Sequence, residues 1–340
     1  MVSLDKMIHL ADGSGFDSLG PVADVEKMAA LGRGTRHDVC ASSASPRQAQ
    51  GHQRLGNVAR SGICHAFTHS GRCISLFKTL FTNSCQHQCN YCPNAAPCKS
   101  PVYSYTPEEL ARTTLSLYRG NYIEGLFLTS GAGRDEDLIM DRMLETVRLL
   151  RQGHRFQGYV HLKVLPGASL ARIQEAMELA DRVSINLEAP SPARMGELCP
   201  TKDYHNDILL RQRYIRDLMS RVSLPAGQTT QLVVGGAGEC DQEIFQRVVQ
   251  EYREMGVKRA YYSAFTPVPG TPFQSRPPQE PWREHRLYQV DWLYRIYGFA
   301  PREIQPAFNE DGFLANCDPK MAIARQSLEG PVDPQQASYQ

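Results

Sequence analysis

The stretch TNSCQHQCNYCPN, residues 82–94, places three cysteines on one short segment, at Cys85, Cys89 and Cys92. A closed structural zinc site takes four protein ligands, usually as two pairs. A four-iron cluster has four iron corners, each normally held by a thiolate. Three thiolates would therefore leave one corner open, and an open metal position is a place for a ligand. The stretch indicates an iron–sulfur site with one open position.

Composition limits the classes of protein that fit. The 340 residues include 37 Lys and Arg against 36 Asp and Glu, so the formal net charge of +1 gives no global signal for a polyanion. The N-terminal stretch MVSLDKMIHLADGSG has no apolar run of signal-peptide length, and no segment approaches the roughly 18 apolar residues of a membrane span. We expect a cytoplasmic protein whose cysteines are reduced, which favours metal or redox chemistry for any cysteine cluster.

From residue 74 onward, short β-rich runs alternate with helical patterns, which predicts βα units and a parallel sheet. One helix is predicted over 106–120, with Thr106 as N-cap and Pro107 and Glu109 in its first turn. Six strands are too few for a closed eight-stranded barrel, so an α/β open partial barrel or a doubly wound sheet remains, with ligands at the ends that follow the strands. The predicted strands are CISLFKTLFT (73–82), IEGLFLTSG (123–131), GYVHLKVLPG (158–167), RVSINLEAP (182–190), TTQLVVGGAGE (229–239) and RAYYSAFTPVPGTP (259–272).

We divide the chain into an irregular basic N-terminal extension (1–73), the barrel (74–275) and a C-terminal helical extension with a tail (276–340). Residues 30–80 carry seven basic residues and one acidic residue, a local excess of 7 − 1 = +6 that favours phosphate contacts. Solvated surface charge is the alternative. The basic residues are Arg33, Arg36, Arg47, Arg54, Arg60, Arg72 and Lys78, and the acidic one is Asp38.

The spacing Cys-x3-Cys-x2-Cys, with Tyr91 directly before the third cysteine, resembles the hallmark of the radical S-adenosylmethionine (radical SAM) superfamily. The resemblance implies a partial (β/α)6 TIM-like barrel with N- and C-terminal extensions and a [4Fe–4S] cluster. It also implies that S-adenosylmethionine chelates the open iron, next to Tyr91, and is cleaved reductively to methionine and a 5′-deoxyadenosyl radical. A reductase or flavodoxin-type protein would donate the electron.

Further cofactor-binding positions follow from the same resemblance. The sequence TSGAG looks like the motif for the methionine amino group, so Ser130 and Gly131 would offer backbone carbonyls, although the motif's usual acidic residue is absent. His161 and Lys163 alternate onto one face of their strand and are expected to meet a carboxylate or phosphate. A buried ion pair between Lys163 and Glu188 is the alternative.

In RVSINLEAP, polar residues occupy one face of a strand where a buried strand would show Val or Ile. Polar groups inside a barrel need partners, and in related enzymes this strand meets the ribose and the methionine carboxylate. QLVVGGAGE resembles the superfamily's adenine motif, with Leu232 in place of its first glycine. The positions implied are Ser184, Asn186 and Glu188 on the first strand, Arg194 for the carboxylate, and Val234, Gly236 and Phe265 around the adenine.

Several stretches look like a narrower branch, the putative DNA modification or repair radical SAM proteins. Members of this branch associate with a partner related to uracil-DNA glycosylase and usually continue into a helix-hairpin-helix element. The resemblance therefore implies nucleic acid as a substrate and such a partner protein. The stretches are CASSAS, GICHAFTHSGRCISLFKTLFTN, HLKVLPG, YYSAFTPVPGTP, LYQVDWLYRIYGF and DPKMA.

A second, auxiliary iron–sulfur cluster is predicted on Cys40, Cys64 and Cys73, which the branch resemblance also covers, with Cys98 or His65 as a fourth ligand. Their wide spacing lacks the tight pairs of most cluster sites. Buried structural thiols are the alternative.

Two other functions stay open. The chain could be a radical SAM enzyme that acts on a peptide or small metabolite. It could also be a non-catalytic nucleic-acid-binding protein, stabilised by zinc at the three cysteines with His87 or Cys98 as the fourth ligand.

Overall fold

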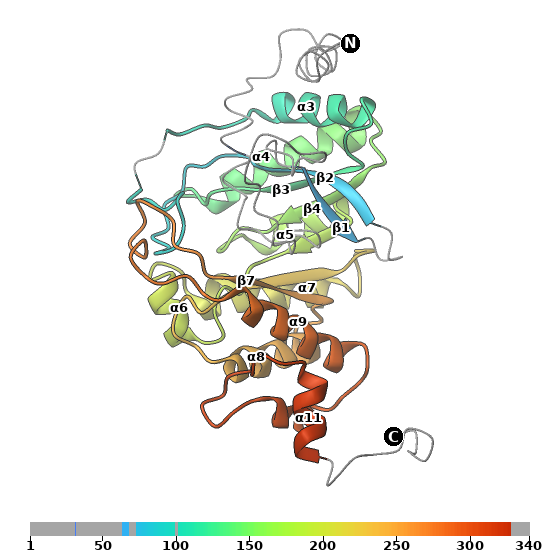
Figure 1. The fold of residues 1–340 in the computed structure, drawn as a ribbon. Coiled ribbons are helices and arrows are strands. Elements are labelled where there is room, and N and C mark those ends of the chain that lie inside the picture. The colour runs from blue at the N-terminus through green and yellow to red at the C-terminus, as the bar shows by residue number, and fades with distance from the viewer. Residues whose placement is uncertain (1–30, 32–62, 68–72, 99–100, 328–340) are drawn as a thin grey trace, which may run out of the picture.

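The computed structural model describes residues 31, 63–67, 73–98 and 101–327, and for 63–67 the backbone alone. A seven-stranded sheet in the order β1-β2-β3-β4-β5-β6-β7 forms its centre (Figure 1). Strands β2 to β7 are all parallel, which confirms the predicted six-stranded partial barrel. The strands are β1 (Ile63–Phe67), β2 (Cys73–Leu80), β3 (Gly125–Thr129), β4 (Tyr159–Lys163), β5 (Arg182–Ser184), β6 (Gln228–Val234) and β7 (Arg259–Ala264).

Strand β1 is a difference from the sequence analysis, which treats everything before residue 74 as irregular. It pairs antiparallel with β2, from Ile63 opposite Phe77 to Phe67 opposite Cys73. A strand at the edge of a sheet presents unpaired backbone groups, and a short apolar run a few residues upstream can satisfy them as a hairpin. The sequence pattern does not indicate this strand, because the residues on either side of Ile63–Phe67 are polar and small.

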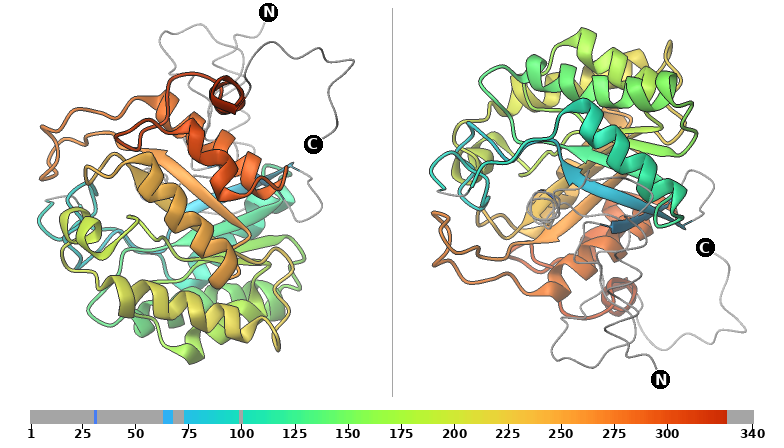
Figure 2. Two further views of the ribbon diagram at one scale, coloured as in Figure 1. Left: turned by 90° about the horizontal axis from the view of Figure 1, so that it is seen from below. Right: turned by 90° about the horizontal axis from the view of Figure 1, so that it is seen from above.

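Helices connect the parallel strands and lie side by side as an outer layer, α3 against α4, α4 against α5, α5 against α7 and α8 against α9 (Figure 2). No described helix has both the length and the apolar character that a membrane span requires. The helices are α3 (Pro107–Arg119), α4 (Glu136–Arg148), α5 (Leu170–Leu179), α6 (Pro192–Leu198), α7 (Leu210–Leu218), α8 (Asp241–Glu254), α9 (Pro281–Arg295), α10 (Pro301–Ile304) and α11 (Pro319–Ser327), with π-helices η1 (Leu149–Gly153) and η2 (Tyr204–Leu209) and the 3-10 helix η3 (Gln305–Ala307).

The start of α3 follows the predicted capping pattern. The Thr106 hydroxyl accepts a hydrogen bond from the Glu109 backbone N–H at 3.2 Å, and the Glu109 carboxylate accepts one from the Thr106 N–H at 3.2 Å. Pro107 occupies the first helical position, where a missing N–H costs nothing. The reciprocal pair fixes where the chain turns from the cysteine loop into the first helix.

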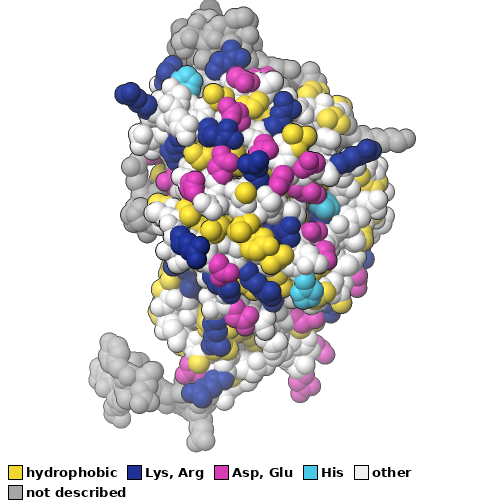
Figure 3. Space-filling model, turned by 180° about the vertical axis from the view of Figure 1, so that it is seen from behind, with side chains coloured by type: hydrophobic (Ala, Val, Ile, Leu, Met, Phe, Trp, Pro, Cys, Tyr) yellow, Lys and Arg dark blue, Asp and Glu magenta, His cyan; other side chains and the backbone are white. Residues whose placement is uncertain are grey.

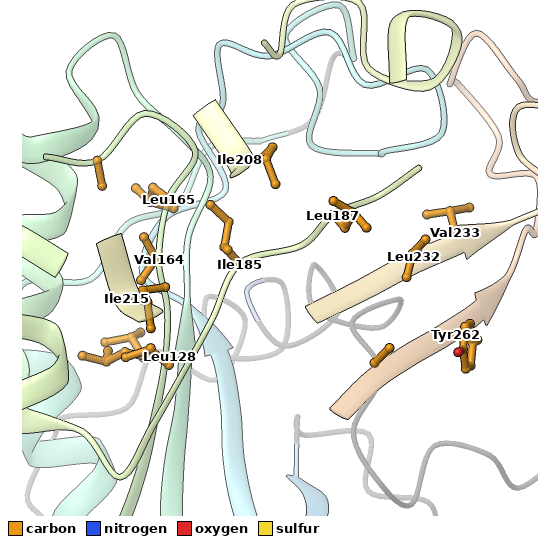
Figure 4. Close-up of a cluster of buried hydrophobic side chains, with 14 of the residues drawn as sticks. Leu128, Val164, Leu165, Ile185, Leu187, Ile208, Ile215, Leu232, Val233 and Tyr262 are labelled. Atoms are coloured by element: carbon orange, nitrogen blue, oxygen red, sulfur yellow. The ribbon is translucent and has the colours of Figure 1, made fainter. Parts of the chain in front are cut away.

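The sheet has two different faces. The outer face packs on the helices and is apolar, and Figure 4 shows Leu128, Leu232 and Tyr262 within this buried layer. The inner face carries a separate small cluster of Ile74, Leu76 and Phe127. Polar residues share this inner face because successive side chains of a strand point to opposite sides.

Helix α9 covers the open edge of β7. The Tyr288 hydroxyl accepts from the Tyr262 N–H at 3.0 Å and donates to the Tyr262 carbonyl at 3.1 Å, and the Glu284 carboxylate accepts from the Ala264 N–H at 2.8 Å. These contacts take the place of a further strand. The predicted helical segment after the barrel thus protects its last edge.

Candidate active site

The cysteine loop directly follows β2, at the carboxyl end of the parallel sheet. Cys85, Cys89 and Cys92 all line one cavity of about 140 Å³. Cys89 is buried, whereas Cys85 and Cys92 are partly exposed. The cavity lies at the edge where the carboxyl ends of parallel strands meet, which is where this class of sheet binds ligands.

A distant segment holds the cysteine loop in place. The Asn90 backbone N–H donates to the Leu198 carbonyl at 2.9 Å, and the Asn90 side-chain amide donates to the Glu197 carbonyl at 2.7 Å. The Gln88 N–H donates to the Thr201 hydroxyl at 2.9 Å. The end of α6 and the turn after it therefore fix the backbone on both sides of the second cysteine, Cys89.

The end of β3 supports the first cysteine. The Gly131 N–H donates to the Thr82 carbonyl at 2.8 Å, and the Gln86 N–H donates to the Ala132 carbonyl at 2.8 Å. A Cβ atom on Gly131 would stand 2.2 Å from the Ser84 carbonyl oxygen, so only glycine lets the two backbones approach this closely. Gly131 of the sequence TSGAG is thus required by packing against the cysteine loop.

A buried hydrogen-bonded chain links the loop to the strand end after β5. The Tyr91 hydroxyl donates to Glu188 at 2.8 Å, and the Lys202 ammonium lies 3.0 Å from the other carboxylate oxygen. The two charged side chains are only 9% (Lys202) and 5% (Glu188) exposed. Burial would raise the pKa of Glu188, but Lys202 and Lys163 outweigh it and lower the pKa, so the carboxyl is ionised.

The backbone at Glu188 is strained. Its φ of +66° lies in the left-handed region, which a residue with a side chain enters at a cost of about 1–3 kcal/mol. Hydrogen bonds from Glu188 N–H to Gln231 (2.9 Å) and from Val233 N–H to Glu188 (2.8 Å) hold it there. This conformation directs the carboxylate into the cavity rather than along the sheet.

The thiols of the site differ in their surroundings. The pKa of Cys89 is lowered to about 7, and the largest cause is a hydrogen bond from the buried Cys199 thiol. Burial raises the pKa of Cys92 to about 12. Thiolates are the form that binds metal, so in the protein without metal Cys89 is closer to the ligating form than Cys92 is.

Seven of the eleven cofactor positions named in the sequence analysis come together at the cavity. Lys202 and His87 also line it, and sequence reasoning named neither as a cofactor residue. Lys202 follows a loop and carries no periodic signal, so its pairing with Glu188 appears only in the fold. The seven are Tyr91, Ser130, Gly131, Lys163, Asn186, Glu188 and Phe265.

The other four positions lie away from the cavity lining. Ser184 is deeper in the barrel, where its hydroxyl is 2.8 Å from the His161 Nε2 atom. Arg194 pairs with Glu243 at 3.1 Å. Val234 is buried in the outer core. Val233, its neighbour in the chain, lines the cavity instead, because successive side chains of a strand point to opposite faces. The Gly236 carbonyl accepts a hydrogen bond from an arginine side chain at 2.7 Å.

The donor set fits an iron–sulfur group. Three thiols of one loop line a single cavity beside the buried cation of Lys202. The Nε2 atom of His87 is buried there and has no hydrogen-bond partner among the described residues. Within the same part of the chain, no three His, Cys, Asp or Glu side chains gather around one point as the ligands of a single ion do. A cluster differs, because each thiolate holds a different iron.

The auxiliary cluster stays a prediction. Cys40 lies outside the described residues, and Cys64 lies on β1, whose side chains are not described. Cys73 is exposed at the first residue of β2, at the end of that strand opposite the cysteine loop. Cys98 is partly exposed, and its sulfur lies 3.5 Å from the Cys92 carbonyl and 3.4 Å from the Gly270 carbonyl.

Comparison with known proteins agrees with this geometry. The radical SAM superfamily profile matches residues 79–248. The structure is similar to methylornithine synthase (PylB), with a TM-score of 0.51 and 14% identity over 65% of this chain and 61% of that chain. It is also similar to the FeFe-hydrogenase maturase HydG from Carboxydothermus hydrogenoformans, with a TM-score of 0.50 and 11% identity over 64% of this chain and 51% of that chain. A search among curated proteins finds no match. At such low identity the structural similarities show a shared fold alone. The matched part spans about three-fifths of the methylornithine synthase and about half of the HydG chain.

Proposed function

The chain belongs to the radical SAM superfamily, and from that premise we propose that it modifies a base or sugar in a nucleic acid, or a free nucleoside derivative, by radical chemistry. One observation carries the chemical part of this proposal. Three cysteines with superfamily spacing line a cavity at the carboxyl ends of six parallel strands, beside a buried Glu188–Lys202 pair.

Cys85, Cys89 and Cys92 would hold three irons of a [4Fe–4S] cluster. When bound, the cluster supplies the electron that cleaves the sulfonium bond of S-adenosylmethionine, which generates the 5′-deoxyadenosyl radical. The chain's own part is to fix the loop and keep the site dry. Tyr91 contributes by tying the loop to Glu188 through a buried hydrogen bond.

The cavity wall offers groups for S-adenosylmethionine. The carbonyls of Ser130 and Gly131 would accept from its amino group, and the cation of Lys163 would meet its carboxylate. Asn186 offers an amide to the ribose, and Phe265 gives the adenine an apolar surface. A core strand end without such a ligand would be lined by aliphatic residues instead.

Nucleic acid as the substrate is supported by the branch resemblance and by the basic stretch 30–80, most of which lies outside the described residues. The same resemblance supports a partner related to uracil-DNA glycosylase, and radical SAM chemistry calls for a reductase or flavodoxin-type electron donor. The auxiliary cluster on the N-terminal cysteines would add a second redox centre.

A second candidate is a small metabolite or peptide. On the face shown in Figure 3, the described Lys and Arg side chains are interspersed with Asp and Glu. A duplex is usually bound by a surface of one sign.

The test is 5′-deoxyadenosine release from S-adenosylmethionine by anaerobically reconstituted protein under a strong reductant. We expect nucleoside product in the wild type with about four irons per chain, or about eight if the N-terminal cysteines hold a second cluster, and in Cys89→Ala the loss of the product and of about four irons. Cys317→Ala, which alters a cysteine outside the cavity, is the matched control and should behave as the wild type. Zinc in place of iron, or no product from the wild type, would contradict the proposal.

The substrate class needs a separate arm. Single-stranded and duplex oligonucleotides, free nucleosides and peptides are each added, and the increase in 5′-deoxyadenosine is compared. If nucleic acid is the substrate, oligonucleotides should increase 5′-deoxyadenosine release, and their affinity for the protein should fall steeply as salt is added. If only peptides or other metabolites increase 5′-deoxyadenosine release, the substrate is of the second candidate class and not a nucleic acid.

A further inference from the structure

Cys199 is a buried thiol to which the proposed chemistry gives no role. Among the cysteines whose side chains the structure describes, only Cys89 and Cys199 are buried, with 6% and 0% of their surface exposed. The three cysteines of the loop line the cavity, whereas Cys199 is not part of that lining. Cys199 is therefore not placed to ligate a group that is bound in the cavity.

The backbone brings the two buried cysteines together. Hydrogen bonds join the residues on both sides of Cys89 to the end of α6 and to the turn after it. Cys199 lies between these two points of attachment. Its N–H donates to the Met195 carbonyl at 2.7 Å, and its carbonyl accepts from the Lys202 N–H at 3.0 Å. The pairing of the two thiols is thus fixed by the fold rather than by the side chains alone.

Two hydrogen-bond donors meet at the Cys89 sulfur. The Cys199 thiol and the Lys202 ammonium are both hydrogen-bonded to Cys89. Lys202 is held there by Glu188, whose carboxylate oxygen lies 3.0 Å from the ammonium nitrogen, and both charged side chains are buried. A sulfur that ligates iron is a thiolate and carries no proton. In the loaded site, Cys199 and Lys202 are therefore the donors and Cys89 is the acceptor.

Hydrogen bonds to ligating sulfurs control the reduction potential of an iron–sulfur cluster. Reduction adds negative charge, and a donor directed at the sulfur stabilises the more negative state. The effect is larger in a buried site, where the local dielectric is low. Cys85 and Cys92 are partly exposed, so Cys89 is the ligand whose surroundings the protein controls most fully.

We propose that Cys199 and Lys202 raise the reduction potential of the cluster by donating hydrogen bonds to the Cys89 sulfur. Cys199 is a positioning residue, because it acts through Cys89. It keeps its proton while the cluster gains one electron from an external electron donor. The inference rests on the proposed function, since it assigns a cluster to the cysteine loop. Without the two hydrogen-bond donors, reduction would need a stronger reductant.

The experiment is a redox titration of the anaerobically reconstituted full-length protein, without S-adenosylmethionine, followed by electron paramagnetic resonance of the reduced cluster. The signal that Cys89→Ala retains is subtracted, so that a second cluster does not contribute. In Cys199→Ala the equilibrium constant for reduction should fall about threefold to tenfold, because a weak donor to a charged group is lost. Since a tenfold change corresponds to about 59 mV for one electron, the midpoint potential should fall by about 28–59 mV.

Matched variants separate hydrogen bonding from packing. Cys199→Ser differs from Cys199→Ala only by a hydroxyl group that can donate, so it should restore most of the wild-type potential. If Cys199→Ala does not hold iron, Cys199→Val takes its place, because valine fills the space of the thiol without a donor. Cys317→Ala alters a cysteine outside the cavity and should keep the wild-type potential.

A double variant tests the second donor. Glu188→Gln combined with Lys202→Met removes the ammonium without leaving a buried charge unpaired, and it should also lower the midpoint potential. An unchanged potential in this double variant overturns the role of Lys202. A wild-type potential in Cys199→Ala or Cys199→Val overturns the role of Cys199. Equal potentials in Cys199→Ser and Cys199→Ala, both below the wild type, overturn it as well, because the thiol would then act by packing alone.

Failure of the two proposals can be distinguished. Release of 5′-deoxyadenosine by the wild type, with no change of potential in the Cys199 variants, leaves the radical chemistry standing and overturns the inference. A lowered potential in Cys199→Ala that Cys199→Ser restores, without 5′-deoxyadenosine release by the wild type under any reductant, supports the hydrogen bond to the cluster ligand and contradicts the radical chemistry.

Discussion

Replacing Glu188 with glutamine should destabilise the protein while leaving its shape almost unchanged. Glutamine can still accept the Tyr91 hydrogen bond, but Lys202 loses its carboxylate partner in a position where its side chain is only 9% exposed. Removing one partner of a buried ion pair costs about 3–5 kcal/mol, because the other charge stays buried.

That free energy corresponds to a measurable shift in melting temperature. Unfolding entropy is about 2.1 cal/mol/K per residue, so a chain of 340 residues loses roughly 0.7 kcal/mol for each degree. A loss of about 3–5 kcal/mol therefore lowers the Tm by roughly 4–7 °C. Thermal unfolding followed by circular dichroism under anaerobic conditions measures it, with and without the reconstituted cluster.

A double-mutant cycle isolates the pair. Lys202→Met should also destabilise, whereas the combination of Glu188→Gln and Lys202→Met should recover most of the loss, since no buried charge is left unpaired. Glu251→Gln is the matched control, because Glu251 pairs with Arg247 on α8 and is equally buried. It should lower the Tm similarly while leaving 5′-deoxyadenosine release intact, whereas Glu188→Gln should reduce that release too.

The reasoning would be refuted by an unchanged Tm in Glu188→Gln. Simple additivity of the two single losses would refute it as well, because it would mean that the carboxylate and the ammonium do not stabilise each other.

Three further perturbations test other parts of the structure. Gly131→Ala should lower the iron content of the reconstituted protein, because its Cβ would stand 2.2 Å from the Ser84 carbonyl, whereas Gly133→Ala meets only a flexible side chain at 3.2 Å and should load normally. Thr106→Ala should cost about 1 kcal/mol in denaturant unfolding through loss of the N-cap, and an unchanged midpoint would contradict the capping geometry. Burial raises the pKa of Asp291, so its contribution to the free energy of unfolding is fully present below about pH 4 and is lost as pH rises through the native pKa. In Asp291→Asn the free energy of unfolding should therefore fall less steeply above pH 4 than in the wild type. Identical pH dependence of that free energy in the two proteins would contradict the assignment to Asp291.

Local signals in the sequence were sufficient for much of the fold. The alternation of β-rich runs with helical patterns gave six parallel strands, and the Thr106 capping pattern located the start of α3 to the residue. The cysteine loop was placed correctly because it follows a strand directly. These features depend on residues close together in the chain, so periodicity and spacing reveal them.

Features that depend on distant contacts were not predictable. Strand β1 exists because β2 offers an edge, and the ion pair of Lys202 with Glu188 needs the left-handed backbone at Glu188 to turn the carboxylate into the cavity. The strands predicted from the sequence are also longer than those in the structure. β5 ends at Ser184, and of the three polar residues predicted on its face only Asn186 and Glu188, which follow the strand, line the cavity, whereas Ser184 lies deeper in the barrel against His161.

The central claim is that three cysteines leave one iron of a [4Fe–4S] cluster open for the amino acid end of S-adenosylmethionine. Electron–nuclear double resonance on the reduced, reconstituted protein tests it directly, with S-adenosylmethionine labelled by ¹⁵N at its amino group. We predict a ¹⁵N coupling that shows the amino nitrogen bound to the cluster. A cluster signal without such a coupling at saturating S-adenosylmethionine would contradict the claim.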